Sequence, residues 1–333
     1  MAQALSKKGI KLTKTKKQKK PVEKASVGSI IVMVILLIYS FSLIALLLWG
    51  LSTSLKSSDE YKVFGNVLGL PDFKNNEYSP LNNYFLVLNA FKYQPEDHSY
   101  LSALFGKISD VGPEGGFTFG SFLINSFIYC ILGAFARTFV AFLCGYLVAK
   151  YRYRFSKFIY VVMLTILAIP IVGSYPAMLK LTRDLALFDS YLGMLILNLN
   201  FTGIYFFVFV AYFQSYSDVY LEAAEIDGSN QFISFFSVVF PMAAKLFWTV
   251  FLLNFIALWN DYQTPLLYYP NHPTLSYAIF KMSTNSVHIM GQAAIEIPQI
   301  VAGCMLLVLP VLALFLATRK ALLGNMSAGG VKE

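Results

Sequence analysis

The chain has 333 residues, of which 57% are hydrophobic and only 13% carry a charge. A soluble domain holds about 25% charged residues, so this composition excludes an ordinary water-soluble protein and favours one whose main solvent is lipid. The formal net charge of +8 resides in residues 1–24, which hold nine lysines and one acidic residue, Glu23.

The lysine-rich segment 1–26 is predicted to be a disordered cytoplasmic tail. It contains no aromatic residue, whereas a nucleic-acid-binding surface interleaves basic and aromatic side chains on a folded face. We therefore expect no nucleic-acid partner. Basic residues beside a membrane helix instead orient that helix and contact anionic lipid head groups.

Six apolar runs are each long enough to cross a bilayer as a helix. They are long and unbroken, unlike the short alternating strands of a barrel, so the predicted fold is an all-α polytopic membrane protein with six transmembrane helices. The first run is too long for the core of a signal peptide. The six predicted spans are 27–51, 121–148, 158–179, 191–212, 244–268 and 297–317.

The placement of lysine and arginine predicts the orientation. With both termini in the cytoplasm, the inner segments hold more basic than acidic residues and the outer segments hold more acidic than basic ones, as the positive-inside rule requires. The inner boundary after the second span is especially clear and consists of Lys150, Arg152, Arg154 and Lys157.

This orientation divides the chain into five parts. The outer segment 52–120 is longer than a bare connection needs and is either an ordered spacer or a small extracytoplasmic cap. The five parts are the tail 1–26, the first transmembrane helix 27–51, the outer loop or cap 52–120, a core 121–318 with five helices, and the cytoplasmic tail 319–333.

The inner connection 213–243 carries the most informative motif. Glu222-Ala223-Ala224 is followed after three residues by Gly228, and nine further residues lead to an apolar segment that ends at Pro241. Glutamate and alanine favour a helix, and glycine ends one readily because it adopts a positive φ. The motif predicts two short helices separated by Gly228, with small side chains against which a partner can dock closely.

This motif resembles the signature of permease subunits of binding-protein-dependent ABC importers: Glu-Ala-Ala, three residues, Gly, nine residues, Ile-x-Leu-Pro. The spacing matches throughout, and Val238 and Phe240 replace the usual Ile and Leu with other apolar residues. The alternative is an accidental amphipathic loop. The resemblance implies the type I importer permease fold, and it implies coupling to a separate ATPase through Glu222, Ala223, Ala224, Gly228 and Pro241.

Other segments are similar to the carbohydrate permeases of this family. Asn125-Ser126 with 146–152 resembles their Asn-Ser … Ala-Tyr-x-x-Ala-Arg pattern, and 258–267 resembles their Trp-Asn-Asp/Glu segment. The end of the chain, 327–332, resembles the Thr-Ala-Gly-Gly-Val-Lys tail of the smaller maltose-permease subunit. In that subunit the tail reaches between the ATPase subunits, which implies an ATPase contact at Ala328, Gly329 and Gly330.

The resemblance, which covers about residues 115–333, implies a multi-pass protein of the bacterial cytoplasmic membrane that forms half of the path for a carbohydrate, most simply an oligosaccharide. The implied partners are a second homologous permease, two ATP-binding subunits, an extracytoplasmic solute-binding protein and the lipid bilayer. The sequence lacks the Gly-x-x-x-x-Gly-Lys-Ser/Thr phosphate loop. ATP and Mg²⁺ are therefore expected in the partner subunits, and we assign no enzyme activity, catalytic residue, metal or cofactor to this chain.

Polar side chains within the spans are costly and are candidates for the solute path. Arg137, near the middle of the second span, either lines the path, pairs across helices or contacts a partner permease. Trp259, Asn260 and Asp261 could together bind and stack on a sugar, with interhelical hydrogen bonding as the rival role. Seven residues before Asp261 lies Asn254, expected near the same helical face. The remaining candidates are Asn198, Asn200 and Tyr205 on the fourth span.

Three alternatives remain at this stage. The same machinery could carry a sugar phosphate or a glycerol phosphodiester, which Arg137 would suit. A self-contained secondary transporter would have inverted repeats and broken helices in matching halves, and a membrane enzyme would need a cluster of reactive side chains. The sequence has no clear repeat and no such cluster, although Pro170, Pro176 and Pro310 predict kinks or broken turns within the spans.

Overall fold

A computed structural model describes residues 26–72, 80–90, 118–151, 153–169, 173–200, 202–284 and 295–323, and every regular element within these ranges is a helix. The predicted ATPase contacts Ala328, Gly329 and Gly330 lie outside the described residues. The chain divides into two compact units, Met1–Leu48 and Trp49–Glu333. The described part of the first unit is the beginning of helix α1 (Val27–Ser54), whose apolar side chains are exposed, as expected for a helix surrounded by lipid.

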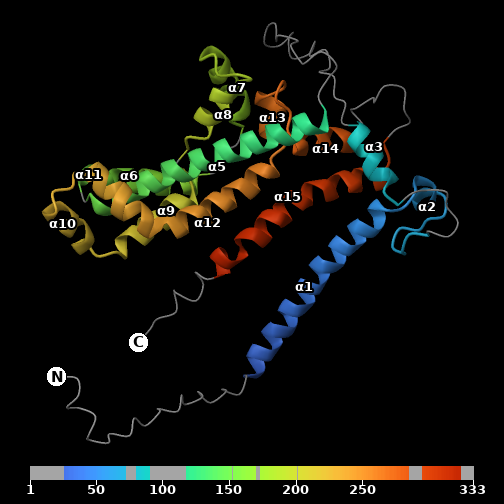
Figure 1. Cartoon of the computed structure of the whole chain (residues 1–333), viewed down its shortest axis with the longest axis horizontal. Coiled ribbons are helices and arrows are strands. Elements are labelled where there is room, and N and C mark those ends of the chain that lie inside the picture. Colours follow the sequence, from blue (N-terminus) through green and yellow to red (C-terminus); the bar gives the residue numbers. More distant parts are fainter. Residues whose placement is uncertain are drawn as a thin grey trace, which may run out of the picture. The chain divides into compact units, whose positions relative to one another are not determined.

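The second unit holds the end of α1 and the remaining helices (Figure 1). In chain order these are α2 (Ser58–Lys62), α3 (Asn82–Ala90), α5 (Phe119–Lys150), α6 (Arg154–Ala168), α7 (Tyr175–Asp184), α8 (Tyr191–Leu197), α9 (Ile204–Gln214), α10 (Val219–Ile226), α11 (Gln231–Ser234), the π-helix η1 (Phe235–Val239), α12 (Phe240–Trp259), α13 (Gln263–Tyr268), α14 (Leu275–Ser283) and α15 (Ile297–Leu323).

Four helical stretches among the described residues are long and apolar enough to cross a membrane: Val27–Ser54, Phe119–Lys150, Gln231–Trp259 and Ile297–Thr318. They overlap the first, second, fifth and sixth predicted spans. The total of six spans, and the sidedness of the termini, remain predictions.

The expectation that 158–179 and 191–212 are single continuous helices is wrong. α6 ends at Ala168 and α7 begins at Tyr175. Pro176 lies in the first turn of α7, where its missing N–H costs no helical hydrogen bond. The second run breaks between α8 and α9, where Gly203 has a φ of 137° that other residues rarely adopt.

The expected helix 244–268 is also wrong at both ends. The structure has one continuous helical rod from Gln231 through η1 to Trp259, followed by the separate short helix α13. Asp261 therefore lies in the turn after α12. The argument that Asn254 and Asp261 share one helical face is consequently incorrect, because no helix joins them. Pro310, by contrast, lies inside α15, which continues past it.

Helix α5 is the centre of the packing and contacts α8, α9, α12 and α14 (Figure 1). Gly145 permits the close approach of α9, because a Cβ atom at this position would lie 2.6 Å from Phe209 Cβ and 3.3 Å from Val210 N. The neighbouring Phe142 is fully buried and makes edge-to-face contacts with several rings. These rings are Phe209, Phe213, Phe235, Phe240 and Phe247, at centroid distances of 5.2–5.7 Å. Such contacts fix the relative positions of α5, α9 and the 231–259 rod.

Candidate functional site

The predicted coupling motif forms the exposed helix α10, which has no buried residue. Glu222 and Ala223 are exposed and Ala224 is half-buried. Apolar side chains are also presented to the surroundings, with Tyr220 56% and Ile226 85% exposed. An exposed helix with small and apolar side chains is suited to docking another protein.

The turn after α10 forms at the predicted glycine. Gly228 has a φ of +82°, and the N–H of Ser229 donates to the carbonyl of Ala224 at 3.0 Å. No atom lies within 4 Å of a Cβ placed at Gly228, so glycine is needed for its backbone conformation rather than for space. Asn230 then begins α11, since its Oδ1 accepts from the N–H of Ile233 at 2.8 Å.

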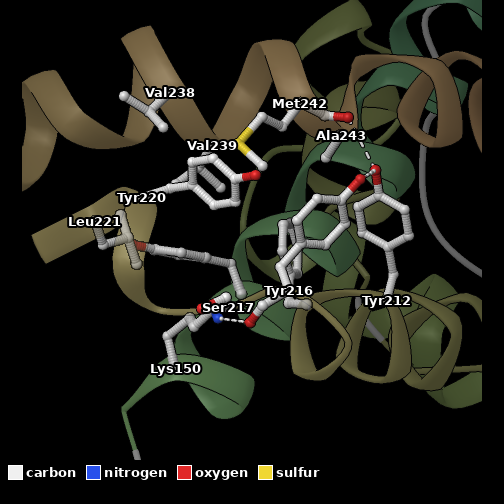
Figure 2. Close-up of a pocket in the computed structure, with 12 residues that line it drawn as sticks. Lys150, Tyr212, Tyr216, Ser217, Tyr220, Leu221, Val238, Val239, Met242 and Ala243 are labelled. Carbon is white, nitrogen blue, oxygen red and sulfur yellow. Dashed lines mark hydrogen bonds between the residues drawn. The ribbon is translucent and has the colours of Figure 1, made fainter. Parts of the chain in front are cut away.

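The base of this loop is attached to α5 through Lys150 (Figure 2). Lys150 Nζ lies 2.6 Å from Asp218 Oδ1 and donates to the carbonyl of Tyr216 at 2.8 Å. Its side chain is only 10% exposed, although that of Asp218 is 59% exposed. This residue therefore joins the last turn of α5 to the chain immediately before α10.

A second attachment joins the end of α9 to the 231–259 rod (Figure 2). The hydroxyl of Tyr212 donates to the carbonyl of Met242 at 2.8 Å and lies 2.8 Å from the hydroxyl of Tyr216. The chain immediately before α10 is therefore bonded directly to α5 through Lys150, and indirectly to α12 through the Tyr216–Tyr212 contact. Sequence reasoning missed the tyrosines. Their spacing of four residues was the available signal, although Tyr216 lies just beyond the end of α9.

Arg137 lies near the middle of α5 and contacts α8. Its Nε donates to Asn198 Oδ1 at 2.8 Å, and Asn198 Nδ2 donates to the carbonyl of Met194 at 2.6 Å. One turn before Arg137, Gly133 leaves room for this approach, since a Cβ there would lie 2.7 Å from Leu258 Cδ1 and 3.2 Å from Asn198 Cγ. The structure thus brings together two predicted candidates that are 61 positions apart in sequence.

Thr138, the next residue of α5, bonds to α12 instead of α8. Thr138 Oγ1 accepts from Asn254 Nδ2 of α12 at 3.0 Å, and both side chains are buried. Adjacent residues on a helix point about 100° apart, so Arg137 and Thr138 contact different helices. Thr138 was not predicted, because a lone threonine in an apolar span carries no distinctive signal.

A further polar cluster surrounds Asp261 after the end of α12. Asp261 Oδ2 accepts from the hydroxyl of Tyr129 at 2.9 Å, and Oδ1 accepts from the N–H of Thr264 at 3.1 Å. Trp259, two residues earlier, is 2% exposed, and its indole donates to the carbonyl of Leu307 in α15 at 3.1 Å. In this conformation Trp259 packs between helices, so a sugar could reach it only after a rearrangement.

The remaining candidates have local partners. Asn260 is exposed, and its Nδ2 donates to the carbonyl of Ile256 at 2.9 Å. Asn200 lies in the turn between α8 and α9, where its Oδ1 accepts from the N–H of Thr202 at 2.7 Å. Tyr205 packs against the aromatic cluster around Phe142. The described residues contain no group of three or more His, Cys, Asp or Glu side chains that could hold a metal ion.

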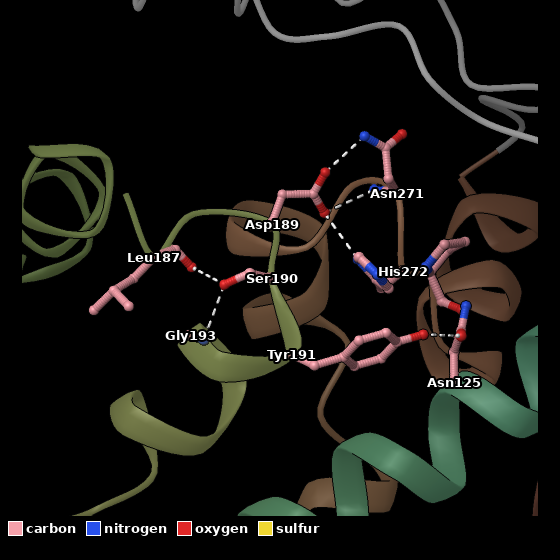
Figure 3. A network of polar contacts seen from close by, with 9 residues as sticks. Asn125, Leu187, Asp189, Ser190, Tyr191, Gly193, Asn271 and His272 are labelled. Carbon is pink, nitrogen blue, oxygen red and sulfur yellow. Dashed lines mark hydrogen bonds and ion pairs between the residues drawn. The ribbon is translucent and has the colours of Figure 1, made fainter. Parts of the chain in front are cut away.

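A polar network links the turn before α8 to the connection between α13 and α14 (Figure 3). Asp189, at a φ of 53°, accepts from the side-chain amide of Asn271 at 2.6 Å and pairs with His272 Nδ1 at 3.2 Å. The hydroxyl of Tyr191 donates to Asn125 Oδ1 of α5 at 3.3 Å. These bonds hold α8, and with it Asn198, at a fixed position beside α5.

The structure has several membrane-length helices, and an exposed helix–glycine–helix loop is bonded to them at its base. These features define a transport permease rather than an enzyme. Residues 138–319 match the family described as "binding-protein-dependent transport system inner membrane component", and the chain belongs to this family. It is therefore a multi-pass protein of the bacterial inner membrane and a subunit of an ABC importer complex with ATPase and binding-protein partners.

Several known proteins are similar to this chain. The arabinooligosaccharides transport system permease protein AraQ of Bacillus subtilis is 25% identical over 219 residues, covering 66% of this chain and 76% of the relative. The sn-glycerol-3-phosphate transport system permease protein UgpE of Pectobacterium atrosepticum is 29% identical over 224 residues, covering 66% and 78%. A chain of a bacterial ABC transporter involved in the import of the acidic polysaccharide alginate has the same fold, with a TM-score of 0.63, 20% identity and coverage of 88% and 96%.

Proposed function

We propose that the chain forms half of the translocation path of an importer for a carbohydrate, most simply an oligosaccharide. The other half is a second homologous permease, and two ATP-binding subunits supply ATP hydrolysis with Mg²⁺. Membership of the family supports the importer role, and the relative named for arabinooligosaccharides supports the solute class. A solute-binding protein delivers the cargo from outside the membrane.

The observation that carries the coupling role is the combination of exposure and attachment at α10. No residue of this helix is buried, yet Lys150 bonds its base to α5 within 2.6–2.8 Å. A helix of this kind can accept a partner and pass its movement on to the membrane helices. Glu222, Ala223 and Ala224 provide the docking face, Gly228 provides the turn, and Pro241 lies where the rod continues as α12.

The polar contacts between helices are the proposed elements of the solute path. Arg137 bonds Asn198 of α8, and Thr138 bonds Asn254 of α12. When ATP-driven closure of the ATPase moves α10, α5 and α12 move with it, and these bonds exchange partners. Amide and guanidinium groups released in this way can bind the hydroxyl groups of a sugar. Asn260 and Asp261 are further candidates, at the end of α12.

A second candidate solute is a sugar phosphate or a glycerol phosphodiester. Among the described residues, no carboxylate forms an ion pair with Arg137, whose bonded partner is the neutral Asn198. A guanidinium with a neutral partner is suited to binding a phosphate, because its planar fork matches the phosphate oxygens. The relative named for sn-glycerol-3-phosphate supports the same alternative.

Reconstitution of the complete complex in nanodiscs tests both proposals. ATPase stimulation by the binding protein is measured with neutral oligosaccharides and with phosphorylated sugars or glycerol phosphodiesters. Stimulation by a neutral oligosaccharide supports the first candidate, and stimulation confined to the phosphorylated compounds replaces it with the second. A chain that never assembles with an ATPase contradicts the importer proposal.

The coupling role is tested in the same preparation with two substitutions of Gly228. Gly228→Pro forces φ to about −65° where the structure has +82°, so stimulation should be lost although the complex still assembles. Gly228→Asn is the matched control, because asparagine tolerates a positive φ and should retain stimulation. Normal stimulation in the proline variant would show that the turn has no role in coupling.

A further inference from the structure

The segment that follows α2 has its apolar side chains outside and its polar side chains inside. Val63, Phe64, Leu68 and Leu70 are 73–85% exposed, whereas Lys56, in the connection between α1 and α2, is fully buried. Residues 63–70 contain no charged side chain. A loop in water would have the opposite arrangement, because exposed apolar groups are costly there and lysine is almost never buried. This distribution indicates apolar surroundings.

The backbone of the same segment is bonded to side chains from its own neighbourhood. Five side-chain hydrogen bonds reach four carbonyl groups between residues 66 and 70. The bonds run from Lys56 Nζ to Asn66 (2.7 Å) and Val67 (3.2 Å), from Trp49 Nε1 to Val67 (2.9 Å), from Ser52 Oγ to Gly69 (3.2 Å), and from Asn66 Nδ2 to Leu70 (3.0 Å). Carbonyls that face water need no such donors. Non-helical backbone in contact with lipid does need them, because lipid supplies none.

Glu60 completes the buried polar interior. It is 6% exposed, and its Oε1 accepts from Asn66 Nδ2 at 2.7 Å and from the N–H of Asp72 at 3.0 Å. The carboxylate thus joins the middle of the apolar segment, at Asn66, to the chain just after it, at Asp72, and faces the interior that contains Lys56. The buried cation and anion leave the exposed face wholly apolar.

The bonds to α1 also define how deep the segment lies. Trp49 lies five residues before Ser54, the last residue of α1, and Ser52 lies two residues before it. At 1.5 Å per residue, the Val67 carbonyl therefore binds α1 at a level about 7 Å before its end. The chain leaves the helix, forms α2 and then returns alongside the last turns of a membrane-length helix. Tryptophan, like tyrosine, is enriched at the level of the membrane interface.

We propose that residues 63–70 insert into the lipid of the bilayer at the end of α1, on the side predicted to be extracytoplasmic. The four large apolar side chains lie among lipid glycerol and acyl groups, and the segment anchors α1 at a fixed depth. Lipid fits better than a docked solute-binding protein, because the segment turns back alongside the last turns of α1 and residues 63–70 contain no charged side chain. The inference depends on α1 spanning the membrane and is independent of the transported solute.

Depth-dependent fluorescence quenching tests this placement in the complete transporter. In a version with alanine at Cys130, Cys144 and Cys304, single cysteines replace either Leu68 or Asp59 and are labelled with an environment-sensitive fluorophore in nanodiscs. Asp59 is the matched control, since it is exposed on the nearby α2. The Leu68→Cys label should emit at shorter wavelength, be quenched by doxyl-labelled lipid and resist aqueous iodide, and the Asp59→Cys label should behave in the opposite way.

A second pair of variants tests whether the buried hydrogen-bond donor Lys56 keeps the segment in place. Lys56→Met removes two of the five bonds to the carbonyls, so iodide should quench the Leu68→Cys label more strongly. Lys62→Met is the control, because Lys62 is exposed and pairs instead with Glu296 at 2.8 Å. Its removal should leave the quenching unchanged.

Three results would overturn the proposal. Equal quenching of the two labels by iodide, without binding protein, would place the segment in water. Protection of the Leu68→Cys label only after addition of the binding protein would make the segment a protein-docking surface. Protection from both iodide and doxyl lipid would mean that a membrane helix of the companion permease covers it.

Discussion

Replacement of Lys150 by methionine should weaken the transmission between α10 and α5 without preventing membrane insertion. Methionine keeps most of the aliphatic length and removes the charge, so the bonds to Asp218 (2.6 Å) and to the Tyr216 carbonyl (2.8 Å) are both lost. A hydrogen bond to a charged group contributes about 1.5–3 kcal/mol when buried. An exposed ion pair contributes about 0.2–1 kcal/mol.

The structure places this interaction between those limits. The Lys150 side chain is largely buried, but that of Asp218 is 59% exposed and is therefore screened by solvent. We expect a loss of about 1–2 kcal/mol, and since 1.4 kcal/mol corresponds to a factor of ten, ATPase stimulation by the binding protein should fall roughly tenfold. Asp218→Asn should have a smaller effect, because the bond from Lys150 to the Tyr216 carbonyl remains.

The assay compares binding-protein-stimulated ATP hydrolysis in nanodiscs with the amount of ATPase that copurifies. Lys157→Met is the matched control, since Lys157 is an exposed lysine of the same predicted inner boundary and forms no ion pair with the described residues. Unchanged stimulation in Lys150→Met, with normal copurification, would refute the argument that this contact transmits movement.

Two further predictions concern the packing around α5. Gly145→Ala should destabilise the protein by about 1–3 kcal/mol in thermal unfolding, because the new methyl group would meet Phe209 Cβ at 2.6 Å. Gly120→Ala, where the nearest atom lies at 3.8 Å, should have little effect, and equal effects of the two changes would contradict the close approach of α9. Thr138→Val and Asn254→Ala should be non-additive in unfolding experiments by about 0.6 kcal/mol, the average for such membrane pairs; strictly additive effects would mean that the 3.0 Å bond contributes nothing.

The parts of the molecule that local sequence determines were predictable. The turn at Gly228 follows from one glycine between helix-forming segments, and the structure has it at φ +82°. The long apolar helices follow from hydropathy in the same way. The breaks after α6 and α8 were harder to predict, because hydropathy averaged over about 20 residues does not reveal the effect of a single residue such as Gly203. Pro170 and Pro176 did indicate an irregularity in the third run, although not that two separate helices would form.

The partners within the candidate path depend on the tertiary structure. Arg137 could be recognised as unusual because of its position in an apolar span, but Asn198 as its partner is 61 residues away. The pairing of Tyr129 with Asp261 joins residues 132 positions apart. Sequence reasoning placed Asp261 on the helix that contains Asn254. The polar residues 260–264, followed by Pro265, were an available signal that this helix ends at Trp259.

The continuous rod from Gln231 to Trp259 has a mechanical consequence. Because η1 joins α11 to α12 without an intervening loop, a movement of α11 passes to α12 along a continuous helical backbone. About 21 residues separate the middle of α11 from Asn254, a length of roughly 32 Å. A tilt of about 5° imposed at α11 would carry the Asn254 amide through about 3 Å, comparable to the whole length of its hydrogen bond to Thr138.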